Sequence, residues 1–319
     1  MELSEVVGHI RLSCIQVALR IERRAQLPPY LGSTLRGVLA RCTREVVCGL
    51  RHPTCDGCLL VERCAYSVLF ETPPDSRLPL WQRRTDWPRP YVIRPPAPRE
   101  KPWLAGEELA FQVLLFGRAA EYAPFLLEAI RQVPGYGLGS GRAKVGVVRV
   151  EDAAQSLLGL SGPAVLKLPS LSVVNPMAAA PDFEGWGSVR LDFETPLRIL
   201  EKGRRVSDLS FQSLIRALIG RVCSVVSFHC GTAASLAEYE DLLEQAGKVL
   251  TTGTSLRDQS LHRWSNRQQR RIPLDGLTGS AVFTGPPLRD FLGLLWAGQF
   301  THVGKGTVHG LGQYRVSHA

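Results

Sequence analysis

The sequence predicts an α+β chain that uses one strand–helix–strand–strand–helix–strand unit twice. The first long predicted helix carries Ser33-Thr-Leu-Arg36-Gly-Val-Leu-Ala-Arg41, and a second helix, 180 residues further on, carries Ser213-Leu-Ile-Arg216-Ala-Leu-Ile-Gly-Arg221. Each half also ends with a helix, a glycine-rich basic loop and a strand that closes on Arg-Val, at Arg149-Val150 and Arg315-Val316. This order of elements, repeated, is that of tandem ferredoxin-like, or RRM-like, domains.

The length and the charge of the chain are consistent with two domains and a polyanionic partner. A chain of 319 residues, 45% of them hydrophobic, has the size of two ordinary domains with real cores. We expect these domains at residues 1–155 and 156–319. The formal net charge is +9 and the pI is about 9.4. Such a charge favours a polyanion, although basic housekeeping enzymes also exist.

The sequence also indicates a cytoplasmic protein. No apolar run reaches the length of a transmembrane helix, and the start, Met1-Glu-Leu-Ser-Glu5, lacks the basic and apolar regions of a signal peptide. In a reducing compartment the eight cysteines are expected to be buried or metal-bound rather than disulfide-bonded.

The first half contains one copy of the repeated unit. β-rich residues predict a strand at 9–20, and a helix at 31–47, with Ser33 as its N-cap, has apolar residues on one face. The remaining predicted elements are strands at 66–71, 91–94, 109–116 and 145–150 and a helix at 121–133.

The second half repeats the unit after a predicted linker. Asp208 or Ser210 is expected to cap a long helix at 211–228. The other predicted elements are strands at 165–168, 188–194, 280–283 and 313–316 and helices at 236–250 and 288–300.

Four cysteines form a compact C-x6-C-x2-C-x5-C cluster in an insert at residues 48–64 of the first domain. They are Cys48, Cys55, Cys58 and Cys64. Four thiolates at such short spacing can close a tetrahedral metal site, with structural zinc as the first choice and an iron–sulfur cluster as the second. The alternative is four unrelated thiols.

A glycine-rich loop with one lysine, at residues 302–312, lies between the last predicted helix and strand. Glycines let the backbone turn sharply, and successive N–H groups in such a turn can bind an anion. The loop lacks the Walker spacing and follows a helix rather than a strand, so a polymer backbone is a better ligand than a mononucleotide. We expect phosphate contacts from Gly304, Lys305, Gly306 and Thr307. The alternative is a tight turn with an incidental lysine.

Other basic segments are candidates for contact with a polyanion. Off its apolar face, where a solvated surface is the usual role, the first helix carries Arg36, Arg41 and Arg44. The first glycine-rich loop carries Arg142 and Lys144, and the most basic segment, at 262–271, carries Arg263, Arg267, Arg270 and Arg271 around Trp264.

A long irregular loop at residues 72–103 is rich in Pro, Arg and Trp. Its aromatic residues Trp81, Trp87 and Tyr91 could stack on unpaired bases, or they could clamp the loop onto the protein surface.

Three segments together resemble the CRISPR-associated RAMP endoribonucleases, the repeat-cleaving enzymes that mature CRISPR RNA. They are the C-terminal Phe300-Thr-His-Val-Gly-Lys-Gly-Thr-Val-His-Gly-Leu-Gly-Gln-Tyr314, the upstream Arg263-Trp-Ser-Asn-Arg-Gln268 with Ile272-Pro-Leu-Asp-Gly-Leu-Thr-Gly279, and the early Leu35-Arg-Gly-Val-Leu39 before the cysteine cluster. The match covers both halves, and its specific part is His262 to Val316. A cysteine-rich insert is seen in one branch of the cleaving enzymes.

The resemblance implies tandem ferredoxin-like domains that hold precursor RNA across a basic surface formed by both halves. It implies a metal-independent reaction in which the 2′-OH upstream of the scissile phosphate attacks in line and leaves a 2′,3′-cyclic phosphate and a 5′-hydroxyl. The implied partners are CRISPR repeat RNA, the mature CRISPR RNA on which the enzyme remains, and other effector-complex subunits. No catalytic metal is expected, because outside the cysteine cluster no paired-carboxylate pattern could hold two magnesium ions.

Such a reaction needs a general base, a general acid and a cation beside the phosphorane. Family enzymes often use a histidine near the first helix together with a tyrosine and a lysine. Here Tyr30 precedes that helix, and the nearest histidine is His52 in the cysteine insert. His52 with Tyr30 is the first candidate pair, and His302 and His262 are alternative proton carriers. If no histidine is used, the candidates become Arg36 and Arg41.

Two other interpretations remain open. The chain could be a non-catalytic RNA-binding subunit of a CRISPR effector complex, which would use the same loops without proton-transfer groups. It could also be a zinc-bearing nucleic-acid adaptor with no enzymatic role. Incubation with labelled repeat RNA in EDTA separates the cleaving enzyme from both.

Overall fold

The computed structural model describes residues 1–50, 54–73, 87–154, 164–165, 171–265 and 270–319. The chain divides into two compact units. The N-terminal unit consists of Arg11–Val174 and Phe228–Cys230. The C-terminal unit consists of Asn175–Ser227 and Gly231–Ala319, together with Met1–Ile10.

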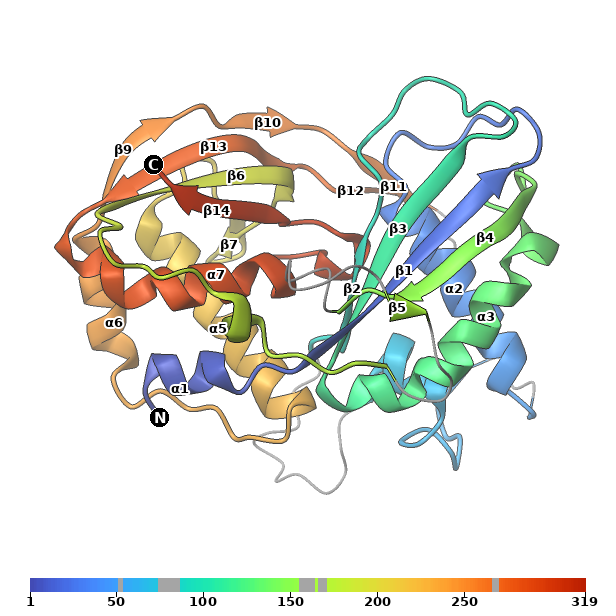
Figure 1. Cartoon of the computed structure of the whole chain (residues 1–319), viewed down its shortest axis with the longest axis horizontal. Coiled ribbons are helices and arrows are strands. Elements are labelled where there is room, and N and C mark those ends of the chain that lie inside the picture. Colours follow the sequence, from blue (N-terminus) through green and yellow to red (C-terminus); the bar gives the residue numbers. More distant parts are fainter. Residues whose placement is uncertain (51–53, 74–86, 155–163, 166–170, 266–269) are drawn as a thin grey trace. The chain divides into compact units, whose positions relative to one another are not determined.

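The N-terminal unit contains an antiparallel sheet in the order β2-β3-β1-β4-β5 (Figure 1). β1 (Leu12–Ile21) pairs with β3 (Glu108–Phe116) on one side and with β4 (Val145–Asp152) on the other. β2 (Tyr91–Arg94) extends the sheet beyond β3, and the short β5 (Ala164–Val165) extends it beyond β4. β1 is apolar and buried over most of its length, which indicates that both faces of this strand are covered.

Two helices of this unit follow β1 and β3. They are α2 (Gly32–Val47) and α3 (Ala123–Tyr136), and a 3₁₀ turn, η3 (Gly117–Tyr122), precedes α3. The helices pack on each other. On α2 the buried residues Leu35, Leu39 and Cys42 recur at helical spacing, so one apolar face explains its position.

The C-terminal unit repeats this strand order as β10-β13-β6-β14, with β9 on another part of β13. β6 (Ser188–Leu197) is central and pairs with β13 (Gly276–Thr284) and β14 (Tyr314–His318). Two short strands, β9 (Leu250–Thr254) and β10 (Arg257–Gln259), share the place of β2. Small hairpins are formed by β7 (Leu200–Glu201) with β8 (Arg204–Arg205) and by β11 (His262–Ser265) with β12 (Arg270–Pro273).

The main helices of the C-terminal unit, α5 (Phe211–His229) and α7 (Leu292–Thr301), lie on one side of this sheet (Figure 1). The ring of Phe211 lies 5.1 Å from that of Phe283 in β13 and 5.6 Å from that of Phe291, between centroids. The remaining helical elements are α1 (Leu3–Gly8), η4 (Pro176–Ala179), α6 (Tyr239–Gly247), η5 (Pro286–Phe291) and η6 (Thr307–His309).

Both units have the strand order and connections of the predicted tandem ferredoxin-like fold. The division of the chain differs from the predicted boundary at residue 155, because the N-terminal unit continues to Val174. Met1–Ile10 belongs to the C-terminal unit, where α1 packs on α7 and the Asn175 side-chain amide donates a hydrogen bond to the Gly8 carbonyl at 2.9 Å.

Several local predictions are wrong. Ser67–Glu71 forms a π-helical turn rather than a strand, with Tyr66 and Phe70 stacked one helical turn apart at 5.7 Å. The predicted helix at 236–250 is confined to α6, and Leu250 begins β9. The first part of the predicted helix at 288–300 is 3₁₀.

The predicted helix caps have different outcomes. Ser33 lies inside α2, whose N-cap residue is Leu31. Ser210 does cap α5, because its side-chain oxygen accepts the Ser213 N–H at 3.1 Å.

One described helix, Phe211–His229, is long and apolar enough to cross a membrane by length and composition alone, contrary to the sequence expectation. In the structure, 56% of its apolar window is buried, and it is the first main helix of the C-terminal unit. Its hydrophobic composition is therefore that of a core helix.

Substitution Gly298→Ala tests the packing of α7 against β14. A Cβ at this position would lie 2.1 Å from the Tyr314 hydroxyl oxygen and 2.5 Å from Cδ2 of Leu218. Tyr314 is buried and its hydroxyl donates to the Leu295 carbonyl at 2.7 Å, so it has no room to retreat. We expect the free energy of unfolding, measured in urea, to fall by about 1–3 kcal/mol.

Gly293→Ala is the matched control in the same helix. A Cβ there would lie 3.5 Å from Cε of Met177, which is an ordinary contact. Stability should stay equal or rise by less than about 1 kcal/mol, since alanine favours helix more than glycine does. Equal losses in the two variants would contradict the packing described.

Candidate nucleic-acid interface

The glycine-rich loop after α7 is built against the backbone that follows β6. Gly304 has φ 85°, and a Cβ there would lie 2.4 Å from the Arg198 carbonyl oxygen. Gly312 has φ 69°, and a Cβ there would lie 1.8 Å from the Val303 carbonyl oxygen. Because both contacts are with backbone atoms that cannot move aside, this path of the loop requires glycine at both positions.

Part of the predicted anion site is wrong, because two of its groups are engaged or buried inside the protein. The Lys305 N–H donates to the Arg198 carbonyl at 2.8 Å, so it is engaged inside the protein. Thr307 is buried at the start of η6, which places its side chain away from the surface. The Lys305 side chain is exposed and is the loop's charged group.

The basic β11–β12 hairpin is joined to this loop through Arg198. The Arg198 guanidinium donates to the Pro273 carbonyl, in the last residue of β12, at 2.9 Å. Its own carbonyl accepts the Lys305 N–H. We call the group that this residue connects the C-terminal basic surface; its residues are Arg198, Arg263, Arg270, Arg271 and Lys305.

Most of the predicted hairpin contacts are available on this surface. Arg270 and Arg271 are exposed, Arg263 is half-buried and the side chain of Trp264 is 55% exposed. Arg267 lies outside the described residues. His262, at the start of β11, is exposed as well, which places an imidazole among these cations.

The N-terminal unit presents a second, shorter glycine-rich loop. Arg142 and Lys144 are exposed there, as predicted for contact with RNA. The guanidinium of Arg41 in α2 lies 4.8 Å from the ring centroid of Tyr136, the last residue of α3. Arg41 therefore braces the helix end before the loop while staying exposed itself.

The structure describes only one residue of the first candidate catalytic pair. His52 lies outside the described residues. Tyr30 is 5% exposed, and burial raises the pKa of its hydroxyl well above the usual value. A tyrosine in this state donates a proton or a hydrogen bond and does not act as a base near neutral pH.

Arg36 belongs to a partly buried cluster with Arg89 and Tyr91. Its guanidinium donates to the Phe70 carbonyl at 3.5 Å. Burial lowers the pKa of Arg89, and the positive charge of Arg36 contributes to the decrease. Burial raises the pKa of Tyr91, and the charges of both arginines oppose that rise. The Glu71 carboxylate also acts on this cluster and raises the pKa of both Arg89 and Tyr91. Two arginines against one carboxylate leave a net positive charge that would attract a phosphate group.

His302 lies inside the protein rather than at its surface. It is 0% exposed, and its Nδ1–H donates to the Leu311 carbonyl across the loop at 3.2 Å. In this conformation the imidazole does not reach solvent. The geometry is therefore that of a residue that supports the loop, and His262 is the more accessible of the two histidines.

The aromatic residues of the long loop are buried, as the clamping alternative predicts. Trp87 stacks on Phe228, with ring centroids 4.0 Å apart, and Tyr91 is buried in β2. Trp81 lies outside the described residues. Neither Trp87 nor Tyr91 offers a free ring face to a base.

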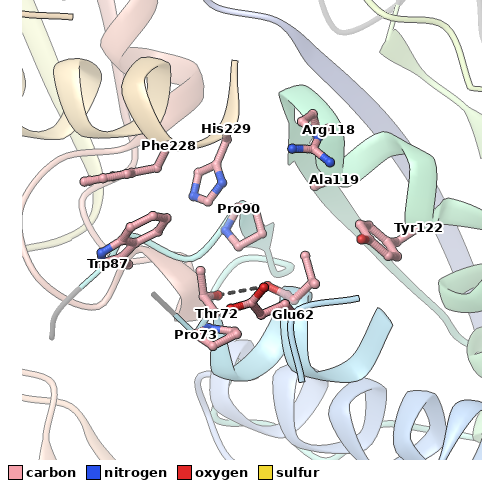
Figure 2. A pocket seen from close by; sticks show the side chains of 11 residues that line it. Glu62, Thr72, Pro73, Trp87, Pro90, Arg118, Ala119, Tyr122, Phe228 and His229 are labelled. Atoms are coloured by element: carbon pink, nitrogen blue, oxygen red, sulfur yellow. Dashed lines mark hydrogen bonds between the residues drawn. The ribbon is translucent and has the colours of Figure 1, made fainter. Parts of the chain in front are cut away.

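Figure 2 shows a small pocket beside this clamp in the N-terminal unit. The Trp87 ring lies against Phe228, and Nε2 of His229 donates to the Pro88 carbonyl at 2.7 Å. The cavity of about 100 Å³ is smaller than the usual size of a small-molecule site. Its lining consists of Glu62, Val68, Thr72, Pro73, Trp87, Pro90, Arg118, Ala119, Tyr122, Phe228 and His229.

The cysteine insert has the donor chemistry of a metal site without its geometry. The four sulfurs are partly buried, and Gly57, with φ 73°, makes a tight turn inside the C-x2-C. Burial raises the pKa of Cys55, the charge of Arg44 opposes this rise, and Glu71, Cys64 and Cys58 add smaller contributions to it. Within the described parts of the chain, no three or more His, Cys, Asp or Glu side chains are arranged to hold a metal ion. Zinc remains a prediction.

Two family models match the chain, one in each half. Residues 10–164 match the model AF_1859_N, described as an N-terminal domain. Residues 191–314, which contain the C-terminal glycine-rich loop and the basic hairpin, match the model of the CRISPR-associated endoribonuclease Cas6. The C-terminal half of the chain therefore matches the Cas6 endoribonuclease family.

Similar proteins align over almost the whole chain. A Cas6 product complex is 17% identical with a TM-score of 0.60, covering 96% of this chain and 100% of the other. Thermus thermophilus Cas6 is 16% identical with a TM-score of 0.57, covering 97% and 99%. A protein of Archaeoglobus fulgidus, described as uncharacterised, is 25% identical over 295 residues, covering 91% and 92%. The solved structures share the tandem ferredoxin-like fold.

The sequence did not indicate two residues that the structure places in these basic clusters. Arg198 makes hydrogen bonds with its backbone carbonyl as well as with its side chain. Every residue has a backbone carbonyl, so the sequence cannot show which one accepts such a bond. Arg89 lies in a stretch with many arginines, where no spacing distinguishes one from the others. Its partly buried position beside Arg36 is a tertiary property.

Lys305→Ala should weaken repeat-RNA binding and flatten its salt dependence. One lost phosphate contact lowers the slope of log K against log salt by roughly 0.7–0.9. Arg289→Ala is the matched control, because this exposed arginine belongs to η5 at the opposite end of α7. Filter binding at several salt concentrations measures both. An unchanged slope for Lys305→Ala would show that Lys305 contacts no phosphate and that the loop is only a turn.

Proposed function

We propose that this endoribonuclease cleaves CRISPR precursor RNA within its repeats. The observation that carries the proposal is the C-terminal basic surface, where Arg198 holds the glycine-rich loop and the basic hairpin side by side. Exposed arginines and a lysine on a rigid loop suit a phosphate backbone. The match of residues 191–314 to the model of the CRISPR-associated endoribonuclease Cas6 supports RNA as the substrate class.

The proposed reaction uses the substrate's own 2′-hydroxyl as nucleophile. Its oxygen attacks the adjacent phosphorus while the bond to the 5′-oxygen of the next nucleotide breaks. The products are a 2′,3′-cyclic phosphate and a 5′-hydroxyl, which receives a proton as it leaves. A general base removes the 2′ proton, a general acid supplies the 5′ proton, and cations stabilise the phosphorane.

Side chains of the N-terminal unit provide the cation and one proton donor. Arg36 and Arg89 form the positive site for the phosphorane charge. Tyr30, whose high pKa keeps it protonated, suits donation rather than proton removal. The role of base is proposed for His52, with His262 as the accessible histidine of the basic hairpin. No metal ion takes part at the scissile phosphate.

A 2′-deoxy substitution immediately upstream of the cut tests this mechanism directly. It removes the nucleophile while leaving every phosphate in place. We expect cleavage to be abolished and binding to change little, as measured with labelled repeat RNA in EDTA. Cleavage of the deoxy substrate, or loss of wild-type activity in EDTA while any bound zinc is retained, would exclude the mechanism.

The arginine pair can be examined in the same assay. Arg36→Ala and Arg89→Ala should each lower the rate constant for cleavage at saturating RNA by about 10²-fold or more, by analogy with the loss of other transition-state charge stabilisers. Arg20→Ala is the control, since this exposed residue of β1 is paired with Glu108 at 3.3 Å. If both arginine variants stay within about tenfold of wild type, the histidines carry the chemistry alone.

A non-catalytic CRISPR-RNA-binding subunit is the second candidate function. The burial of Tyr30 and His302 favours it, because neither side chain reaches solvent in this conformation. Repeat RNA that is bound tightly but left intact would support this function over cleavage. In either case we propose that the protein works in the cytoplasm, stays on mature CRISPR RNA and contacts other effector subunits.

We also propose that the cysteine insert binds one structural zinc ion, with an iron–sulfur cluster as the alternative. Four soft thiolate donors and the turn at Gly57 support the proposal. Elemental analysis should find about one zinc per chain. Cys55→Ser should reduce the fraction of folded protein more than the rate of the molecules that remain folded. Metal-free wild-type protein, or an iron–sulfur absorption band, would reject zinc.

A further inference from the structure

The two glycine-rich loops close with the same backbone hydrogen bond. In the N-terminal unit the Leu138 N–H donates to the Ala143 carbonyl at 3.0 Å. In the C-terminal unit the Val303 N–H donates to the Gly312 carbonyl at 3.1 Å. Each acceptor lies two residues before the strand that follows its loop, β4 in the N-terminal unit and β14 in the C-terminal unit. The two loops therefore occupy equivalent places in the duplicated fold, and their first residues can be compared directly.

The residue that opens each loop has the same unusual backbone conformation. Gly137 has φ 72° and ψ 174°, and its equivalent, His302, has φ 56° and ψ 169°. This region is essentially reserved for glycine. At Gly137 a Cβ would lie 2.6 Å from the Arg142 carbonyl oxygen, so glycine is required there. The C-terminal unit instead keeps a histidine in a glycine conformation, which needs an explanation.

The hydrogen bond of the His302 imidazole to the other end of its loop explains this conformation. The C-terminal loop spans Val303–Gly312, whereas its counterpart spans only Leu138–Ala143. The buried Nδ1–H of His302 reaches the Leu311 carbonyl, next to the end of the longer loop. It thus adds a side-chain hydrogen bond to the backbone bond that the two loops share.

An arginine side chain contacts the C-terminal residue of the helix that precedes each loop. Arg41 and Arg221 hold equivalent places in α2 and α5, according to the 180-residue repeat. Arg41 covers the ring of Tyr136, the last residue of α3, and the Arg221 Nε–H donates to the carbonyl of Thr301, the last residue of α7, at 3.1 Å. Burial lowers the pKa of Arg221 to about 10, which leaves it charged near neutral pH. A cation at a helix C-terminus is also favoured by the helix dipole.

We propose that His302 and Arg221 are positioning residues that fix the glycine-rich loop and thereby hold Lys305 in place for the RNA phosphate. The proposal rests on the proposed function for the role of Lys305, but its structural part is independent of RNA. It assigns His302 no proton transfer to the substrate. It also explains why a histidine persists in a glycine conformation at the start of this loop.

Hydrogen exchange of the RNA-free protein tests the structural part with two His302 variants. His302→Gly relieves the backbone but removes the imidazole, whereas His302→Asn keeps a donor, because the Asn side-chain nitrogen can take the place of Nδ1 and Asn tolerates positive φ. We expect exchange at Val303 and Lys305 to accelerate at least about tenfold in His302→Gly and to return close to wild type in His302→Asn. Equal protection in all three proteins would overturn the proposal.

RNA measurements test the functional part with the same variants. His302→Gly should lose the Lys305 contribution to the salt slope and raise KM more than it lowers kcat, and His302→Asn should restore both values. An inactive His302→Asn with a fully protected loop would show that His302 acts on the substrate, against the proposal. If neither the wild type nor any variant cleaves repeat RNA, the proposed function is wrong. The hydrogen-exchange result then still tests whether His302 fixes the loop.

Arg221→Met tests the brace separately, and Arg216→Met is its control in the same helix. Arg216 is exposed and pairs with Glu201 at 3.4 Å, away from the end of α7. We expect faster exchange at Lys305 and a flatter salt slope for Arg221→Met only. A general loss of stability with both properties unchanged would remove Arg221 from the positioning pair.

Discussion

The backbone contact between Gly304 and Arg198 is the constraint on which the C-terminal basic surface depends. Only glycine allows the loop to approach the Arg198 carbonyl closely enough for that oxygen to accept the Lys305 N–H. The same residue reaches Pro273 with its side chain, so it sets the place of the loop and of the hairpin together. Arg198 directly follows β6, a strand that is paired on both edges, so the surface is anchored to the sheet of its unit.

Much of the fold could be predicted from the sequence because each unit has to bury the same helix faces and strands. The arginine pattern shared by α2 and α5 revealed the duplication, and both sheets have the order that it implies. Short elements were less predictable. Ser67–Glu71 is apolar and aromatic like a strand, but the Val68 N–H pairs with the Cys64 carbonyl and continues a helical turn. A stretch of five residues contains too little periodicity to separate these two outcomes.

Some properties of the candidate site could be predicted from the local sequence, and others depend on the tertiary structure. The glycine spacing indicated a sharp loop with an exposed Lys305, and the structure places it so. The same spacing could not show that the Lys305 N–H is engaged, since its partner lies over a hundred residues away in the sequence. Exposure is equally non-local: His302 and Tyr30 are chemically suitable proton carriers, yet both are buried. The pairing of Arg36 with Arg89 likewise depends on how β2 and α2 come together.

The central claim is that the Lys305 loop holds one particular phosphate of the repeat RNA. A scan of repeat RNAs, each with a neutral methylphosphonate at a single linkage, tests it most directly when wild type and Lys305→Ala are compared in binding. The account predicts one linkage whose neutralisation weakens wild-type binding but has almost no further effect on Lys305→Ala. If every neutralisation weakens both proteins by the same factor, Lys305 contacts no specific phosphate and the account is wrong.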